Sequence, residues 1–249
     1  MYKIAKITFR PFEEERQSQI DTIDVFLNML FMNGQILDNT VLEDHGTHFV
    51  ARVVTTDSDA LNPKYFNEYI RDELSKFDMT TEIVCDDPLA EDHCNCKSHS
   101  FLVIFACMEE QSSPVICGDC GREIPLFHLP YLFGEKEHYS FLSWQRMYQC
   151  TETLWRESLS DRFTKRQMID PRSQLNQRGL EIRQELEYKT QTPVYLFLRN
   201  QIGGLYNFEK NNKDLSDCPN CGGNFRLLEN APVDKVCDTC KLAFFNMQK

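Results

Sequence analysis

The sequence predicts an α+β protein with a ferredoxin-like βαββαβ N-terminal part, a helical middle segment and a cysteine-rich ribbon at the C-terminal end. Over residues 1–90 the expected elements follow the order strand, helix, strand, strand, helix, strand, which is the order of a split βαβ fold. Apolar residues recur at helical spacing between residues 141 and 186. Two Cys-x-x-Cys pairs lie close to the C-terminus.

The elements of the N-terminal part follow from hydrophobic spacing and turn signals. Its four strands are predicted at residues 2–10, 36–42, 48–55 and 80–85. The first helix, within residues 13–32, carries an apolar stripe that stops before Gly34, a residue type common just after helices. The second helix is expected to begin at Asn62-Pro63, because asparagine caps a helix and proline fits its first position.

The remainder of the chain divides into three further segments. We expect a cysteine-rich β segment over 91–137, a helical segment over 138–203 and the ribbon over 204–249, after the ferredoxin-like domain of 1–90. In the helical segment one long helix covers 138–160 and another opens at Asp170-Pro171. The aromatic stripe of the long helix is interpreted as core, since such stripes are usually buried.

The two C-terminal Cys-x-x-Cys pairs are separated by fifteen residues, the spacing of a zinc site. Two intervening residues allow a tight turn to direct both sulfurs at one ion. Four thiolates leave no open coordination position, so the predicted zinc is structural and not catalytic. The predicted ligands are Cys218, Cys221, Cys237 and Cys240.

A second metal knuckle is a weaker candidate in the segment 91–137. One Cys-x-x-Cys pair is again followed by glycine, and the upstream stretch DHCNCKSH supplies a Cys-x-Cys pair with His93 and His99 on either side. The candidate ligands are Cys94, Cys96, Cys117 and Cys120. Two alternatives stay open: reduced thiols packed in the core, and a catalytic cysteine beside a histidine.

Charge is unevenly distributed along the chain, whose formal net charge is -11. Residues 1–138 hold 11 Lys/Arg and 25 Asp/Glu, whereas residues 139–249 hold 16 and 13. A contact with phosphate backbones must therefore use the second half. There, Arg162, Lys165 and Arg166 surround Phe163 and form a candidate nucleic-acid-binding patch. The alternative is a solvated helix end.

Several classes of protein lack support in the sequence. The chain has no GxxxxGK[ST] loop, no GxGxxG after a strand, no HExxH helix and no GxSxG elbow. We therefore predict no enzymatic activity, no catalytic residue and no small-molecule substrate. No apolar run reaches the length needed to cross a bilayer. The N-terminus is interpreted as a strand and not a signal peptide. Together with metal-type cysteine pairs, these features predict a cytoplasmic protein.

The ribbon and the stretch SSPVICGDCGREIPLFHLP carry a resemblance to a known family. On these residues the chain resembles an uncharacterised bacterial family described as zinc-ribbon-containing, candidate nucleic-acid-binding proteins. The resemblance spans most of the chain and includes the terminal position of the ribbon. It implies a bound zinc ion and a nucleic-acid partner.

Two functional hypotheses follow. The first is a non-enzymatic zinc-ribbon protein that binds nucleic acid through its less acidic C-terminal half. The alternative is an acidic inhibitor or adaptor of a basic protein, such as an immunity protein that neutralises a basic toxin, because a large acidic surface accelerates association with a cationic partner.

Overall fold

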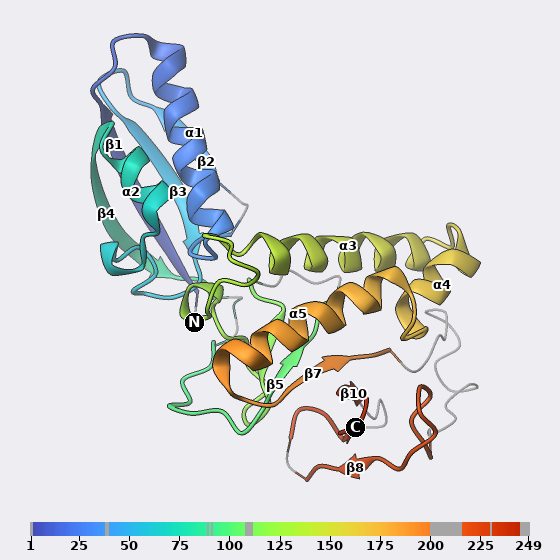
Figure 1. Cartoon of the computed structure of the whole chain (residues 1–249). Helices are drawn as coiled ribbons and strands as arrows, with labels where there is room; N and C mark the ends of the chain where they lie inside the picture. Colours follow the sequence, from blue (N-terminus) through green and yellow to red (C-terminus); the bar gives the residue numbers. More distant parts are fainter. Residues whose placement is uncertain are drawn as a thin grey trace. The chain divides into compact units, whose positions relative to one another are not determined.

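The computed structural model of the chain contains two compact units, each built on its own β-sheet (Figure 1). It describes residues 2–37, 40–88, 90, 92–107, 112–199, 216–229 and 231–244. Unit 1 comprises Met1–His93 and Ile124–Tyr139, and unit 2 comprises Cys94–Glu123 and Ser140–Lys249. The chain thus leaves unit 1 for the cysteine-rich segment and returns to it before the long helices begin.

Unit 1 has the predicted ferredoxin-like topology. Its elements are β1 (Lys3–Pro11), α1 (Arg16–Met32), β2 (Val41–Asp44), β3 (Phe49–Thr55), α2 (Glu68–Leu74) and β4 (Phe77–Asp86). The strands lie in the order β2-β3-β1-β4, and every neighbouring pair is antiparallel. The strand order follows from two interleaved split βαβ units: α1 connects β1 to β2 past the position of β3, and α2 connects β3 to β4 past the position of β1. The α+β prediction is confirmed.

The core of unit 1 lies between one face of this sheet and its two helices (Figure 1). Alternate β1 residues Ala5, Ile7 and Phe9 are fully buried, as expected for a strand with one covered face. Phe26 of α1 lies edge-on to Phe77, with ring centroids 5.0 Å apart. Burial of these side chains supplies most of the driving force for folding of this unit.

The predicted strand at 36–42 is wrong in its bounds, because β2 begins only at Val41. Ile36 forms a single bridge to Thr55 instead. The preceding turn is held by buried amide side chains: Asn33 Nδ2 donates to the Tyr65 carbonyl at 3.0 Å, and Gln35 donates to the Ala60 carbonyl. Buried polar groups of this kind require such partners, which commits this stretch to a turn.

The helix expected from Asn62-Pro63 is also corrected. Asn62 caps only a short 3-10 helix, Pro63–Tyr65. The α2 helix starts later, after Asn67, whose side chain accepts a hydrogen bond from the Ile70 backbone N–H at 2.9 Å. Both asparagines therefore cap a helix, and the α-helix begins more than one turn later than the sequence signal predicts.

Unit 2 is built on a six-stranded sheet of order β6-β5-β7-β10-β9-β8. Its strands are β5 (Leu102–Ile104), β6 (Val115–Cys117), β7 (Val194–Phe197), β8 (Arg226–Leu227), β9 (Lys235–Cys237) and β10 (Leu242–Phe244). The central strand β7 is parallel to β5 on one side and to β10 on the other. The ribbon strands are therefore part of the same sheet as the first cysteine-rich segment.

Three helices follow in the middle of unit 2: α3 (Tyr139–Arg156), α4 (Asp161–Ile169) and α5 (Gln174–Thr190). The single helix predicted over 138–160 ends early, since Ser158 and Ser160 adopt positive φ angles of 56° and 55°. The predicted start of the next helix at Asp170-Pro171 is a turn, and Ser173 caps α5 by accepting a hydrogen bond from Asn176.

Helix α5 packs against β7 at a glycine. A Cβ added at Gly179 would lie 2.8 Å from Leu196 Cδ1 and 3.0 Å from Trp144 Nε1. The Trp144 indole N–H donates to the Leu175 carbonyl at 3.0 Å, so α3 and α5 are joined at the same place. Among the described residues, no helix has the length and apolar composition needed to cross a membrane.

Candidate metal centres

The four cysteines predicted as zinc ligands of the ribbon converge in the structure. One sulfur each from Cys218, Cys221, Cys237 and Cys240 lies within 4.8 Å of the others. The sulfurs of Cys221 and Cys237 are 3.7 Å apart. Four sulfurs placed tetrahedrally at about 2.3 Å from one ion lie about 3.8 Å from each other. The cluster is thus compatible with a zinc ribbon.

A tight turn presents the first sulfur pair. The Cys218 N–H donates to the Gly223 carbonyl at 2.9 Å, and the Gly222 N–H donates back to the Cys218 carbonyl at 2.8 Å. Gly222 has a φ angle of +69°, which glycine adopts without steric cost. The glycine after the second cysteine is therefore required by the turn that orients both thiols.

The second candidate cluster forms as well. The sulfurs of Cys94, Cys96, Cys117 and Cys120 also lie within 4.8 Å of one another. Its Cys-x-x-Cys turn repeats that of the ribbon: Cys117 N–H donates to the Arg122 carbonyl at 2.9 Å, and Gly121 N–H donates to the Cys117 carbonyl at 2.9 Å. Gly121 likewise has a positive φ, +76°. Two groups of four cysteines could therefore hold metal ions.

Both clusters lie at the same end of the strands in the unit 2 sheet. Cys117 ends β6 and pairs with Leu102, the first residue of β5. Cys237 ends β9 and pairs with Leu242, the first residue of β10. Since β5 and β10 run parallel to β7 on its two sides, the clusters flank the start of that central strand.

Thiol ionisation differs between the cysteines because their surroundings differ. Burial raises the pKa of Cys237 to about 12 and that of Cys117 to about 11. At the exposed Cys221, a hydrogen bond from the Gly223 backbone N–H lowers the pKa to about 7. A bound cation deprotonates its thiol ligands, so metal binding would release protons chiefly from the buried cysteines.

Two further donor side chains approach the second cluster. His99 Nδ1 lies 3.3 Å from Cys117 Sγ and 4.0 Å from Cys94 Sγ. Asp119 forms a smaller donor group with His99 and Cys117. The sequence singled out His99 as a neighbour of the cysteines, whereas Asp119 carried no signal beyond its place inside Cys-x-x-Cys. His93, the other histidine considered, lies in unit 1 and contacts Asp57 at 3.3 Å.

The predicted nucleic-acid-binding residues lie on α4. Arg162, Lys165 and Arg166 are exposed there, and Arg166 is 3.5 Å from Asp170. Phe163 is 56% exposed and lines a groove of about 420 Å³ between α3, α4 and α5. Several other arginines of this half contact carboxylates; Arg178, for example, lies 2.9 Å from Glu181.

Comparisons with known proteins divide the chain in a similar place. Residues 1–83 match the model of a domain of unknown function, DUF8589, and residues 96–199 match that of a domain of unknown function, DUF2310. The boundary between the two matches lies close to the boundary between Met1–His93 and the segment that follows. The second match ends before the ribbon.

Two similar proteins come from Haemophilus influenzae, and each is described as an uncharacterized protein. One is 24% identical over 249 residues, which covers 92% of both chains. The other is 26% identical over 169 residues, which covers 65% of this chain and 78% of the relative. No solved structure gives a significant match. These names do not mention zinc or nucleic acid.

Proposed function

We propose that this protein is a non-enzymatic zinc protein that binds nucleic acid through unit 2. Two four-cysteine groups with thiolate ligands suit zinc, and such closed sites leave no coordination position for a substrate. The zinc ions then stabilise the fold of the ribbon and of the first knuckle. Binding is assigned to the helical surface of the same unit.

The observation that carries this proposal is an exposed aromatic ring among cations on α4. Phe163 is 56% exposed at the rim of the α3–α4–α5 groove. Arg146 lines the same groove, Arg162 directly precedes Phe163 on α4, and Arg166 follows Phe163 by three residues. Within the described part of the chain, no carboxylate forms an ion pair with Arg146 or Arg162. Such a surface suits a single strand, because a base can stack on the ring while cations hold phosphates.

Charge distribution supports the same assignment. Unit 1 contains 9 Lys/Arg and 21 Asp/Glu, while unit 2 contains 18 and 17. Phosphates are therefore repelled by unit 1 and not by unit 2. The excess acidity of unit 1 is also the observation that favours the second candidate function, an inhibitor or adaptor that binds a basic protein such as a toxin.

Fluorescence anisotropy with labelled single-stranded and duplex oligonucleotides tests the proposal. The triple variant Arg162→Gln, Lys165→Gln, Arg166→Gln should bind single strands about tenfold or more weakly, with a shallower salt dependence, because each lost phosphate contact removes about 0.7 from the slope on single strands. The matched control is Lys64→Gln, Arg71→Gln, Lys76→Gln, which removes the same charge from unit 1.

Equal loss in both triple variants would contradict the α4 assignment. If the wild-type protein bound no oligonucleotide even at low salt, the nucleic-acid proposal would be refuted, and the acidic unit 1 would become the leading surface. Its partner would then be sought among basic proteins by titration calorimetry with a candidate toxin.

A further inference from the structure

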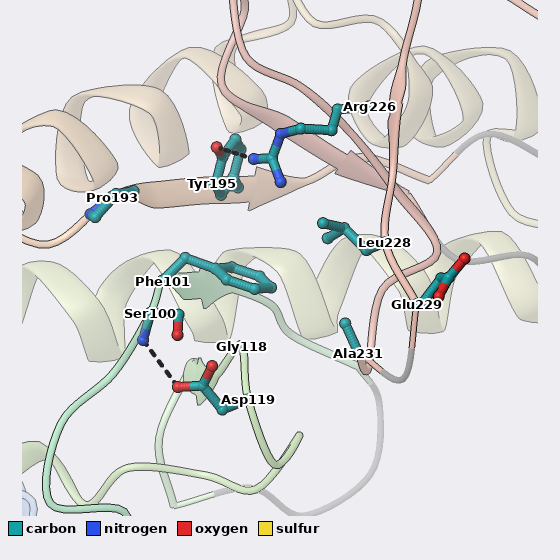
Figure 2. A pocket seen from close by; sticks show the side chains of 10 residues that line it. All are labelled: Ser100, Phe101, Gly118, Asp119, Pro193, Tyr195, Arg226, Leu228, Glu229 and Ala231. Atoms are coloured by element: carbon teal, nitrogen blue, oxygen red, sulfur yellow. Dashed lines mark hydrogen bonds between the residues drawn. The ribbon is translucent and has the colours of Figure 1, made fainter.

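A pocket of about 390 Å³ lies in unit 2 between the two cysteine modules. Figure 2 shows that Ser100 and Asp119 form one wall, while Arg226 and Glu229 belong to the ribbon hairpin on the other. Phe101 and Tyr195 lie between them. The volume falls in the lower part of the range for ligand pockets, which suits a small group or a single side chain.

The aromatic floor is fixed in place. Phe101 and Tyr195 meet edge to face, with ring centroids 5.8 Å apart and an interplanar angle of 86°. A Cβ added at Gly118 would lie 2.4 Å from the Phe101 ring, and the Gly118 N–H donates to the Phe101 carbonyl at 2.9 Å. The knuckle backbone therefore packs directly on the phenylalanine and holds its ring against the pocket.

The positive charge of Arg226 is already balanced. Its guanidinium donates to both Asp238 carboxylate oxygens, at 2.8 and 2.9 Å, and to the Tyr195 hydroxyl at 2.9 Å. Tyr195 in turn donates to Asp238 Oδ1 at 2.5 Å. This network closes one end of the pocket and adds no net charge to it.

Two further carboxylates line the pocket. Asp119 Oδ2 accepts the Ser100 backbone N–H at 2.8 Å, and Glu229 is exposed at the opposite wall. Across the residues that the structure describes, neither carboxylate takes part in an ion pair with Lys or Arg. The pocket thus combines an aromatic floor with negative charge on two sides, which attracts cations and repels phosphate.

We propose that this pocket binds a guanidinium group, the head of an arginine side chain. A guanidinium is planar and weakly hydrated, so it stacks on an aromatic ring and pairs with carboxylates at the same time. Hydrogen bonds between a charged donor and a charged acceptor are stronger than those between neutral groups. The pocket is separate from the α4 groove, and its proposed ligand is positively charged, whereas a nucleic acid is negatively charged.

NMR titration of the zinc-loaded full-length protein with capped arginine (N-acetyl-L-arginine N-methylamide) tests the proposal. Saturable shifts are expected at the amides of Gly118, Asp119 and Leu228. Capped citrulline, which has the same shape without the charge, should bind at least about tenfold more weakly. Equal binding of the two compounds, or no saturable shift with arginine, would overturn the proposal.

Substitutions locate the interaction. Asp119→Asn and Glu229→Gln should each weaken arginine binding by about tenfold. The control Glu181→Gln, which neutralises a carboxylate on α5 outside the pocket, should leave the affinity unchanged. Zinc content measured on each variant separates loss of the ligand site from loss of the knuckle. Unchanged affinity in both pocket variants would refute the assignment even if arginine bound elsewhere.

Comparison with free L-arginine identifies the source of the guanidinium. If capped arginine binds as tightly as the free amino acid, the pocket receives a side chain of a protein partner. If the free amino acid binds about tenfold more tightly, its ammonium and carboxylate groups contribute, and the ligand is a small molecule. Oligonucleotide binding at α4 should be unaffected by either compound, so this proposal and the proposed function are tested separately.

Discussion

Glycines at positive φ differ in what surrounds them. Gly34 has a φ of +72°, and a Cβ there would lie 2.4 Å from Leu126 Cβ. Gly46 has a similar φ of +79° with nothing within 4 Å of such a Cβ. A side chain at Gly46 would therefore meet backbone strain alone, whereas a side chain at Gly34 would meet both backbone strain and steric overlap. The sequence indicated Gly34 as a helix stop, but the overlap with Leu126 comes from a residue that lies far away in the chain.

Substitution of these glycines is predicted to have unequal effects. Gly34→Ala should lower the free energy of unfolding by about 2–4 kcal/mol, since strain and overpacking add. Gly46→Ala should cost about 1 kcal/mol, because only the backbone conformation is disfavoured. Urea unfolding followed by circular dichroism measures both. Similar losses in the two variants would show that Leu126 moves aside without cost.

At the level of elements, local features were predictable and long-range ones were not. The Cys-x-x-Cys-Gly turns are set by residues within five positions of each other, so spacing indicated the ribbon cluster directly. The second cluster is a weaker prediction from the sequence, because it also needs the β5–β6 pairing to bring the Cys-x-Cys pair beside the second turn. The ferredoxin-like order likewise followed from element succession. By contrast, parallel pairing of β10 with β7 joins residues such as Leu242 and Leu196, and no local pattern encodes that register.

Two other features of unit 2 could not be predicted from the sequence. The Tyr195–Arg226–Asp238 network joins three separate parts of the chain through side chains alone. The helix break after Arg156 depends on positive φ angles at two serines, a conformation that serine rarely adopts. The pair Gly203-Gly204 also predicts a hinge before the ribbon, because two glycines in a row favour a flexible joint. These two residues lie outside the part of the chain that the structure describes.

The shared sheet of unit 2 predicts a selective response to metal removal. A chelator that removes zinc from thiolate sites should accelerate amide hydrogen exchange in β7, β9 and β10. Without its metal the ribbon loosens, and β10 no longer protects the side of β7 with which it pairs. Strands β1 and β3 of unit 1 should keep their protection and serve as the internal control. Hydrogen exchange is measured by mass spectrometry of peptic peptides. An unchanged exchange rate in β7 would indicate that the ribbon does not stabilise the central strand.

At the level of the whole molecule, the candidate metal sites and the excess negative charge lie in different units. Unit 1 carries the excess of negative charge, and both four-cysteine groups lie in unit 2. The two family matches divide the chain near the same boundary. Unit 2 therefore holds both candidate metal sites, and we expect it to bind two metal ions.

Metal content of the purified protein, measured by inductively coupled plasma mass spectrometry, tests that claim most directly. We expect two zinc ions per chain, because each four-cysteine group forms a complete tetrahedral ligand set. Cys117→Ser with Cys120→Ser should reduce the content to one, and Cys237→Ser with Cys240→Ser should remove at least one. The control Cys85→Ser with Cys150→Ser alters two exposed cysteines outside the clusters and should retain both ions. Full metal content in either cluster variant, or a wild-type protein without zinc, would contradict the account.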